Sequence, residues 1–152
     1  MKLNYKIRFA KPKDIHQIIN LCEAHARYER CDFLRKNKAT QLSNGLFSET
    51  PKLYCLVVET EDELVGYASY TIQYSIWDAC EYIYMDCLYL KETARNQNIG
   101  EQLINTIKKE GKKLGYNLMQ WQAPDFNIKG IKFYRRIGAT SKKKERFFLE
   151  IN

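Results

Sequence analysis

The spacing of apolar residues predicts two helices in the first third of the chain. From Ile15 to Cys22, apolar residues recur at i, i+3, i+4 and i+7, which gives a helix one apolar face. Pro12 stands just ahead of them, where the first turn of a helix accepts proline, and we expect this helix to run to about Tyr28. A weaker helical pattern covers residues 39–47.

Apolar runs rich in Tyr, Ile, Leu and Val predict the strands. Leu53–Glu59 and Leu64–Ser75 flank the acidic turn 60–63, which is typical of a β-hairpin. A long run, Cys80–Leu90, follows the hairpin. The other expected strands are Tyr5–Ala10, Leu118–Trp121 and Arg146–Ile151.

Helical spacing returns in the C-terminal half. It begins at Ile99 and reaches a glycine end at Gly111 or Gly115, and a last helix is expected from an Asn127 cap to Gly138. The predicted order is β-α-α-β-β-β-α-β-α-β. Hairpins followed by a crossover predict a mixed, mostly antiparallel, twisted sheet flanked by helices. We therefore expect a single α/β (α+β) domain over residues 1–152.

Composition narrows the function classes. With 152 residues, 45% of them hydrophobic, the chain can bury a core without disulfides or metals. Five scattered cysteines and two histidines lack zinc-site spacing, so we expect no metal and reduced, largely buried thiols in a cytoplasmic protein. The first residues lack a signal peptide's apolar run, and no uncharged stretch is long enough to span a bilayer.

Positive charge is concentrated in the second half. The net charge is +7, of which +2 lies in residues 1–76 and +5 in residues 77–152. This asymmetry indicates an anionic partner, with nucleic acid, a membrane and a phosphorylated cofactor all open. For the run Lys142–Lys144 a solvated turn is the favoured interpretation.

The most informative segment is Tyr84–Leu90 together with Arg95–Gly100. A strand leads there into a polar, glycine-containing turn that opens a helix. Such a turn directs backbone N–H groups and the positive end of the helix dipole toward one point, which suits a pyrophosphate. Arg95 adds a fixed positive charge. Many polar turns before helices bind nothing, so the turn alone leaves both interpretations open.

The run Arg-x-x-x-Ile-Gly at residues 95–100 resembles the CoA-binding signature of the GNAT acetyltransferase superfamily. Other segments resemble its spermidine/spermine N-acetyltransferase branch: Ala26–Glu29, the loop around Trp77, Tyr84–Asp86 and Asn127–Ala139. The resemblance covers nearly the whole chain and implies a GNAT-like fold with acetyl-CoA as cosubstrate. Two residues depart from it: Asn98 replaces the usual glycine, and Glu101 adds a negative charge near the diphosphate.

The resemblance also implies roles for single residues. The backbone of Leu88, Tyr89 and Leu90 is expected to pair with the pantetheine arm, and the Leu88 amide to hold the thioester oxygen as negative charge develops. Tyr134 corresponds to the tyrosine that protonates the departing thiolate, although its helical spacing also suits a core aromatic. The remaining expected CoA contacts are Arg95, Asn96, Gln97, Asn98, Ile99, Gly100, Glu101, Asn127 and Lys129.

The acceptor side is predicted in the same way. Asp86 aligns with a glutamate that serves polyamine acetylation, and Tyr28 and Glu29 match a pair that lines the acceptor site. Strand alternation predicts that Asp86 shares one face with Tyr82, Tyr84, Leu88 and Leu90. The alternative interpretation is that Asp86 meets water where the sheet splays and that Tyr28 and Glu29 form a solvated helix end. His25 is interpreted as a surface or packing residue.

The predicted reaction is acetyl transfer to the primary amine of a small polyamine, diamine or lysine-like substrate. Such an amine has a pKa near 10.4, so Asp86 is expected to bind the ammonium and pass its proton out through a water. The alternatives are a protein, peptide or aminoglycoside N-acetyltransferase and a non-catalytic CoA-binding sensor. The chain lacks the aromatic and basic platform of a nucleic-acid binder. By analogy with the family we expect a homodimer, without nucleic-acid or membrane partners.

Overall fold

The computed structural model describes residues 1–152, which form two compact units, Met1–Gln122 and Ala123–Asn152. One domain over the whole chain stays a prediction. The first unit contains β1 (Lys6–Phe9), α1 (Ile15–Tyr28), α2 (Lys38–Phe47), β2 (Tyr54–Glu59), β3 (Leu64–Ser75), β4 (Cys80–Leu90), α3 (Ile99–Lys113) and β5 (Met119–Gln120). The second contains α4 (Ile128–Arg136).

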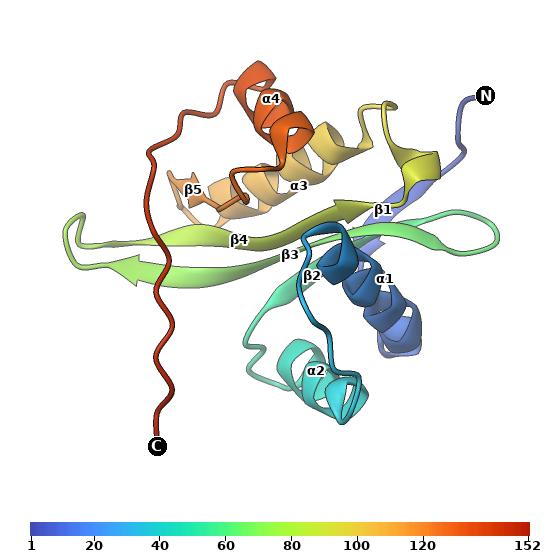
Figure 1. The fold of residues 1–152 in the computed structure, drawn as a ribbon, viewed down its shortest axis with the longest axis horizontal. Coiled ribbons are helices and arrows are strands. Elements are labelled where there is room, and N and C mark those ends of the chain that lie inside the picture. The colour runs from blue at the N-terminus through green and yellow to red at the C-terminus, as the bar shows by residue number, and fades with distance from the viewer. The chain divides into compact units, whose positions relative to one another are not determined.

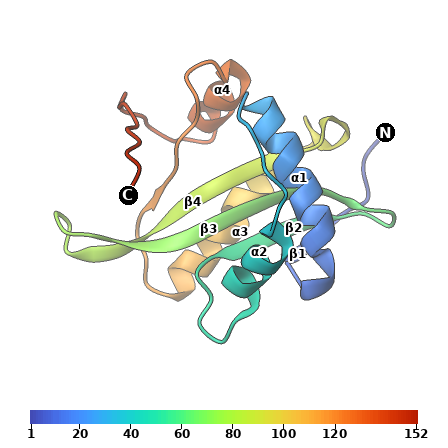
Figure 2. The same cartoon turned by 60° about the horizontal axis from the view of Figure 1, so that its bottom comes forward.

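The sheet of the first unit has five strands in the order β1-β2-β3-β4-β5. Neighbouring strands are antiparallel except β5, which runs parallel to β4. The predicted mixed, mostly antiparallel sheet is therefore confirmed. Helices α1 and α2 lie on one face and α3 lies on the other, as Figure 1 and Figure 2 show.

The predicted helical faces form the core. Ile15, Ile18 and Ile19 of α1 pack in one cluster with Val57 and Tyr67 of the sheet. On α3, the buried residues Ile99, Leu103 and Ile107 follow the spacing that predicted the helix. Both faces of the central strands are thus covered by apolar side chains.

A β-bulge interrupts the pairing of β3 with β4. Ser69 lies opposite Cys87 and Tyr70 lies opposite Met85, which leaves Asp86 without a partner on β3. One strand therefore has one residue more than the other at this point, as in a β-bulge.

The bulge corrects the expected face of Asp86 and its neighbours. Tyr84 lies opposite Thr71, whereas Leu88 lies opposite Ala68. Thr71 and Ala68 are three positions apart on β3 and so point to opposite faces. The expectation that residues 82, 84, 86, 88 and 90 share one face is wrong, because the extra residue reverses the alternation midway along β4.

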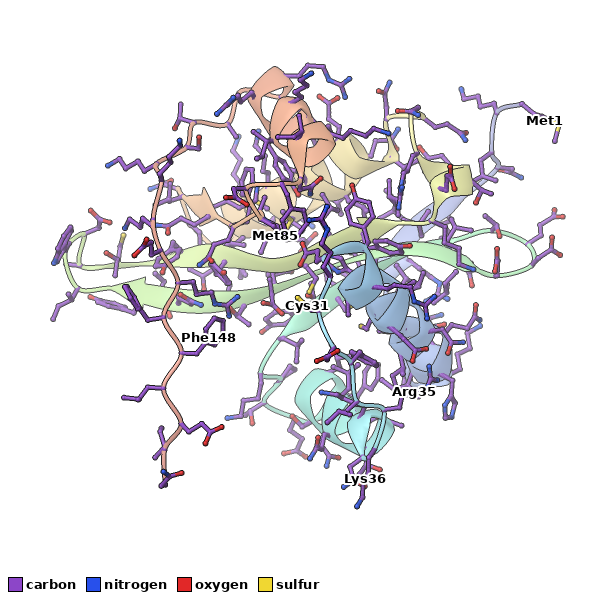
Figure 3. All side chains as sticks on the ribbon, in the orientation of Figure 1. Met1, Cys31, Arg35, Lys36, Met85 and Phe148 are labelled. Carbon is purple, nitrogen blue, oxygen red and sulfur yellow. The ribbon has the colours of Figure 1, made fainter.

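In the second unit, α4 begins and ends as predicted. The Asn127 side chain accepts a hydrogen bond from the Gly130 N–H at 3.1 Å, and Gly138 follows the helix with φ +95°. The predicted strand Arg146–Ile151 is wrong, since these residues pair with no strand. Phe147, Phe148 and Leu149 are 81–94% exposed, and Figure 3 labels Phe148 on this extended segment.

The cysteines are only partly as expected. All five are free thiols, and Cys55 is buried while Cys22 and Cys87 are half-buried. Cys31 and Cys80 are exposed, so the expectation of largely buried thiols is wrong for these two. Cys31 follows the end of α1 (Figure 3) and Cys80 begins β4, where no element covers them.

A half-buried arginine joins β1, β2 and the start of α1. The Arg8 guanidinium donates to both Asp14 oxygens at 2.7 and 3.0 Å and to both Glu59 oxygens at 2.8 and 2.7 Å. The side chains of Arg8 and Asp14 are only 10% and 4% exposed. The hydrogen bonds from Arg8 hold the pKa of Asp14 below its ordinary value despite burial, which favours the neutral acid.

We predict that Arg8→Met lowers the unfolding free energy by about 3 kcal/mol at pH 7, because it leaves the buried Asp14 carboxylate without a counter-ion. The native pair contributes fully above the ordinary aspartate pKa of 3.8, and its contribution is lost as the pH falls through the lowered native pKa. The difference between the two proteins should therefore shrink in strong acid. Urea unfolding at several pH values measures it.

The matched control is Lys113→Met, which removes a cation from the exposed pair with Glu110 at 2.7 Å. Exposed pairs contribute at most about 1 kcal/mol, so this variant should unfold nearly as the wild type does. Equal losses in the two variants would show that Arg8 does not stabilise the fold through Asp14.

Candidate active site

Beyond the bulge, the outer edge of β4 has no strand beside it. β5 pairs with β4 only at Ile83 and Tyr84, so the ladder on this side stops before Met85, which Figure 3 labels. The predicted pantetheine segment Leu88–Leu90 lies on this open edge. An extended chain can pair with the unpaired backbone groups of such an edge.

Two hydrogen bonds establish which backbone groups face the open edge. The Lys91 N–H donates to the Val65 carbonyl on β3 at 2.8 Å, whereas the Ile83 N–H donates to the Leu118 carbonyl beside β5 at 3.0 Å. Backbone N–H directions alternate along a strand, so Leu88, three residues before Lys91, directs its N–H away from β3. The Leu88 amide therefore faces the open edge.

The turn after β4 prepares the N-terminus of α3. Asn96 and Asn98 both have left-handed backbones, with φ 61° and 60°. Asn98 is the cap residue of α3 and makes no side-chain cap hydrogen bond. The N–H groups of the first helical turn have no partner within the helix, so they can receive an anion at this end. Asn thus takes the backbone conformation that favours glycine at this position.

The side chains of the same turn are partly occupied. Gln97 donates to the Thr93 carbonyl at 3.1 Å and accepts the Leu3 N–H at 2.8 Å. Arg95 donates through Nε to the Leu90 carbonyl at 2.9 Å. These contacts hold the turn in place, and the groups left toward an anion are mainly backbone amides.

The Arg95 guanidinium joins this turn to the end of α1. It lies over the Tyr28 ring, 4.9 Å from its centre, and also near the Tyr89 ring at 5.7 Å. Both distances are within the range of cation–π attraction. Arg95 and Tyr28, predicted for the cofactor and the acceptor respectively, therefore lie in direct contact.

The His25 ring interacts with both predicted acceptor carboxylates, Glu29 and Asp86. Its Nε2 atom lies 3.4 Å from the Glu29 Oε1 atom, and the Asp86 charge also acts on its ring. On its other side, Nδ1 lies 2.8 Å from the Tyr67 hydroxyl. The ring stacks on Tyr89 with centroids 5.3 Å apart. Glu29 thus lies beside the imidazole, and the charge of Asp86, distant in sequence, acts on the same ring.

Burial controls the charge states in this group. His25 is 9% exposed, and desolvation lowers its pKa although Glu29 and Asp86 act to raise it. Desolvation also raises the pKa of Tyr67 and raises that of Cys87 to about 12. At neutral pH the imidazole is therefore uncharged, while the phenol and the thiol keep their protons.

The interpretation of His25 as a surface residue is wrong, and a packing role is incomplete. The residue stands four positions after buried Leu21 and four before Glu29, so it follows the buried side of α1 and can reach the carboxylate. This spacing was a usable signal for the Glu29 contact. The contacts with Tyr67 and Tyr89 depend on other strands and leave no local pattern.

Residues 13–139 match the family described as "Acetyltransferase (GNAT) family". The chain belongs to this family. A thialysine N-epsilon-acetyltransferase of Bos taurus is 30% identical over 141 residues, covering 88% of this chain and 82% of that protein. The spermidine/spermine N(1)-acetyltransferase-like protein 1 of Homo sapiens is 25% identical over 143 residues, covering 89% of this chain and 20% of that protein.

A solved structure confirms the fold of this GNAT protein. The aminoglycoside N-acetyltransferase AAC(6')-Iy in complex with CoA superposes with a TM-score of 0.81 at 13% identity, over 99% of this chain and 97% of that one. The family match and the relative at 30% identity show that the GNAT protein is an acetyl-CoA-dependent N-acetyltransferase, and the predicted family and enzyme class are confirmed.

Three predicted site residues of the acetyltransferase lie in its second unit. Asn127 uses its side chain to cap α4, Lys129 is exposed, and Tyr134 is half-buried with its ring 5.2 Å from that of Phe133. Their contacts with CoA stay predictions. No group of three His, Cys, Asp or Glu side chains is placed to hold a metal ion, and no helix is long and apolar enough to cross a membrane.

We predict that Asn98→Ala lowers the unfolding free energy of the acetyltransferase by about 1 kcal/mol, because a Cβ without a polar group is disfavoured at positive φ. Asn98→Gly should change it by less than about 0.5 kcal/mol, since glycine adopts this conformation freely. Urea unfolding of both variants measures the difference. An equal loss of unfolding free energy in both variants would show that the left-handed backbone is not its cause.

Proposed function

We propose that the chain transfers the acetyl group of acetyl-CoA to the primary amine of a small polyamine, diamine or lysine-like substrate. The observation that carries the cofactor part is the Leu88 N–H, which faces the open edge of β4 just ahead of the α3 N-terminus. A carbonyl oxygen that gains charge during acetyl transfer needs such a fixed donor. Acetyl-CoA supplies the acetyl group as a thioester.

The backbone of Leu88–Leu90 would hold the pantetheine arm, and the first-turn amides of α3 would hold the pyrophosphate. The left-handed Asn98 supports this, because it lets the turn direct its amides as a glycine would. Arg95 would add positive charge from its position on Tyr28. Asn127 and Lys129 are proposed as further contacts on the resemblance alone.

The amine part of the proposal rests on two carboxylates, Glu29 beside His25 and Asp86, whose charge acts on the same ring. Glu29 is half-buried and Asp86 is exposed at the bulge, so both can attract a cation from solvent. A primary amine with a pKa near 10.4 arrives as ammonium, whereas only its neutral form attacks a thioester. Asp86 would bind the ammonium and pass its proton to a water. Tyr28, 42% exposed at the end of α1, would line the same opening.

Tyr134 would donate a proton to the departing thiolate, a role that the family resemblance supports. A free thiol has a pKa near 8.5 and a phenol a pKa near 10, so this donation is weak unless the site changes one of them. Most of the rate enhancement is therefore assigned to alignment of the amine and to the Leu88 donor.

The names of the relatives support the substrate class, since they include thialysine and spermidine/spermine acetyltransferases. We extend the proposal to a homodimer in the cytoplasm. The five free thiols suit a reducing compartment, and the exposed apolar residues of the C-terminal segment suit an interface between copies.

We predict that the protein releases CoA thiol from acetyl-CoA with spermidine, putrescine or a lysine analogue as acceptor. An aminoglycoside and a basic peptide should give a kcat/KM at least about tenfold lower. A thiol-detection assay across this panel measures both. Turnover of only the aminoglycoside or the peptide would contradict the substrate class, and no turnover with any amine would contradict the proposed acceptor chemistry.

We predict that Tyr134→Phe lowers kcat by at least about tenfold, because it removes the proton donor. The affinity for acetyl-CoA and the unfolding free energy should stay close to the wild type. Tyr74→Phe makes the same change at an exposed tyrosine of β3 and serves as the control. An unchanged kcat in Tyr134→Phe would remove this residue from the mechanism.

A further inference from the structure

The buried imidazole of His25 has a defined set of partners on three elements of the first unit. Glu29 lies on its Nε2 side at the end of α1, and the Tyr67 hydroxyl of β3 lies on its Nδ1 side. Tyr89 of β4 stacks on the ring at an interplanar angle of 21°, and Tyr67 meets it edge-on at 70°. These rings hold the imidazole plane, so it has little freedom to turn.

The two partners of the ring favour one tautomer of His25. The pKa of Tyr67 is raised by burial, so its hydroxyl keeps its hydrogen and can donate it to Nδ1. Neutral imidazole has one donor and one acceptor nitrogen. The Glu29 carboxylate can only accept, so the tautomer that suits both partners has its hydrogen on Nε2, facing the Glu29 Oε1 atom at 3.4 Å, and accepts from Tyr67 at Nδ1. The three side chains thus form the directed series Tyr67 to His25 to Glu29.

A donor beside the Glu29 carboxylate stabilises its charge and its position. It follows the last residue of α1, where the negative end of the helix dipole disfavours a carboxylate. Its side chain is 31% exposed, and a glutamate in that position otherwise samples many rotamers. A contact to one oxygen, Oε1, limits that freedom and leaves the other oxygen available to a cation.

We propose that His25 is a positioning residue that orients the Glu29 carboxylate toward the acceptor amine, with Tyr67 selecting the required tautomer. This inference rests on the proposed function, because it presumes that a cationic amine binds at Glu29. His25 itself touches neither the amine nor acetyl-CoA in this proposal, so it acts through Glu29 on amine affinity.

The charge of His25 also affects amine binding at Glu29. The charged and titratable groups that act on its ring or contact it are Glu29, Asp86, Tyr67 and Tyr89. Cys22 and Cys87 act on Tyr67, and Arg95 lies on Tyr89. A protonated imidazole would pair with Glu29 as an ion and compete with the ammonium for it. As the pH falls through the lowered pKa of His25, the KM for a cationic amine should therefore rise.

The test compares His25→Leu with His25→Gln in steady-state kinetics, with spermidine and acetyl-CoA varied in turn. Leucine fills the space without polar atoms, whereas glutamine can still accept from Tyr67 and donate to Glu29. We expect His25→Leu to raise the KM for the amine about tenfold, since it removes the polar contact that orients the Glu29 carboxylate. The KM for acetyl-CoA should stay within about twofold, and His25→Gln should restore most of the amine affinity while losing the rise of KM in acid.

A double variant isolates the route of the effect. In a Glu29→Gln background, His25→Leu should change the amine KM by less than about twofold, because the residue through which it acts is already lost. Tyr67→Phe removes one hydroxyl and keeps the ring, so it supplies a milder variant if His25→Leu fails to fold. It should raise the amine KM about threefold without changing that for acetyl-CoA.

Independent, multiplying effects of His25→Leu and Glu29→Gln would overturn the inference, as would equal effects of leucine and glutamine at position 25. A parallel rise in the KM for acetyl-CoA would also overturn it, since it would indicate a general structural role. In each of these cases the wild type still acetylates the amine. A wild type that acetylates no amine would instead overturn the proposed function itself, and the inference with it.

Discussion

The β-bulge at Asp86 is the feature on which both parts of the candidate site depend. Asp86 has no partner on β3, so the residues after it point to the opposite face and the opposite edge from those expected in a regular strand. Ile83, before the bulge, directs its N–H toward the segment of β5, whereas Leu88, after it, directs its N–H to an edge that no strand covers. In an unbroken strand these two residues would face opposite edges. The same bulge turns Cys87 and Tyr89 toward the α1 side of the sheet. One extra residue thereby orients both the Leu88 amide at the proposed cofactor edge and the side chains on the proposed acceptor face.

The acceptor and cofactor regions of the first unit share a continuous set of contacts. Arg95 leaves the turn before α3 and lies on Tyr28 and Tyr89, and Tyr89 stacks on His25. Each contact uses a ring face, which restrains position while leaving the polar edges free for other partners. The glutamate at the end of α1 and the turn before α3 are therefore connected through His25, Tyr89 and Arg95.

Local patterns were sufficient for most elements, because helix and strand periods are written in neighbouring residues. The left-handed turn at Asn98 was also within reach, since asparagine tolerates that backbone. The bulge at Asp86 was not, because an extra residue is defined only by the register of another strand. Arg146–Ile151 shows the opposite failure: its residues suit a strand, but a strand exists only when a partner pairs with it. His25 gained its role from Tyr67 and Tyr89, which sequence spacing does not connect to it.

The alternation of backbone directions along β4 limits where such a protein can gain or lose single residues. Between Asp86 and Leu88, adding or removing one codon would exchange the two edges of the strand and turn the Leu88 amide toward β3. The tip between β3 and β4, where Ile76 and Trp77 are 87% and 95% exposed, carries no such constraint and can accept insertions. Within one hairpin, a stretch of strict length thus lies beside a stretch that is free to vary.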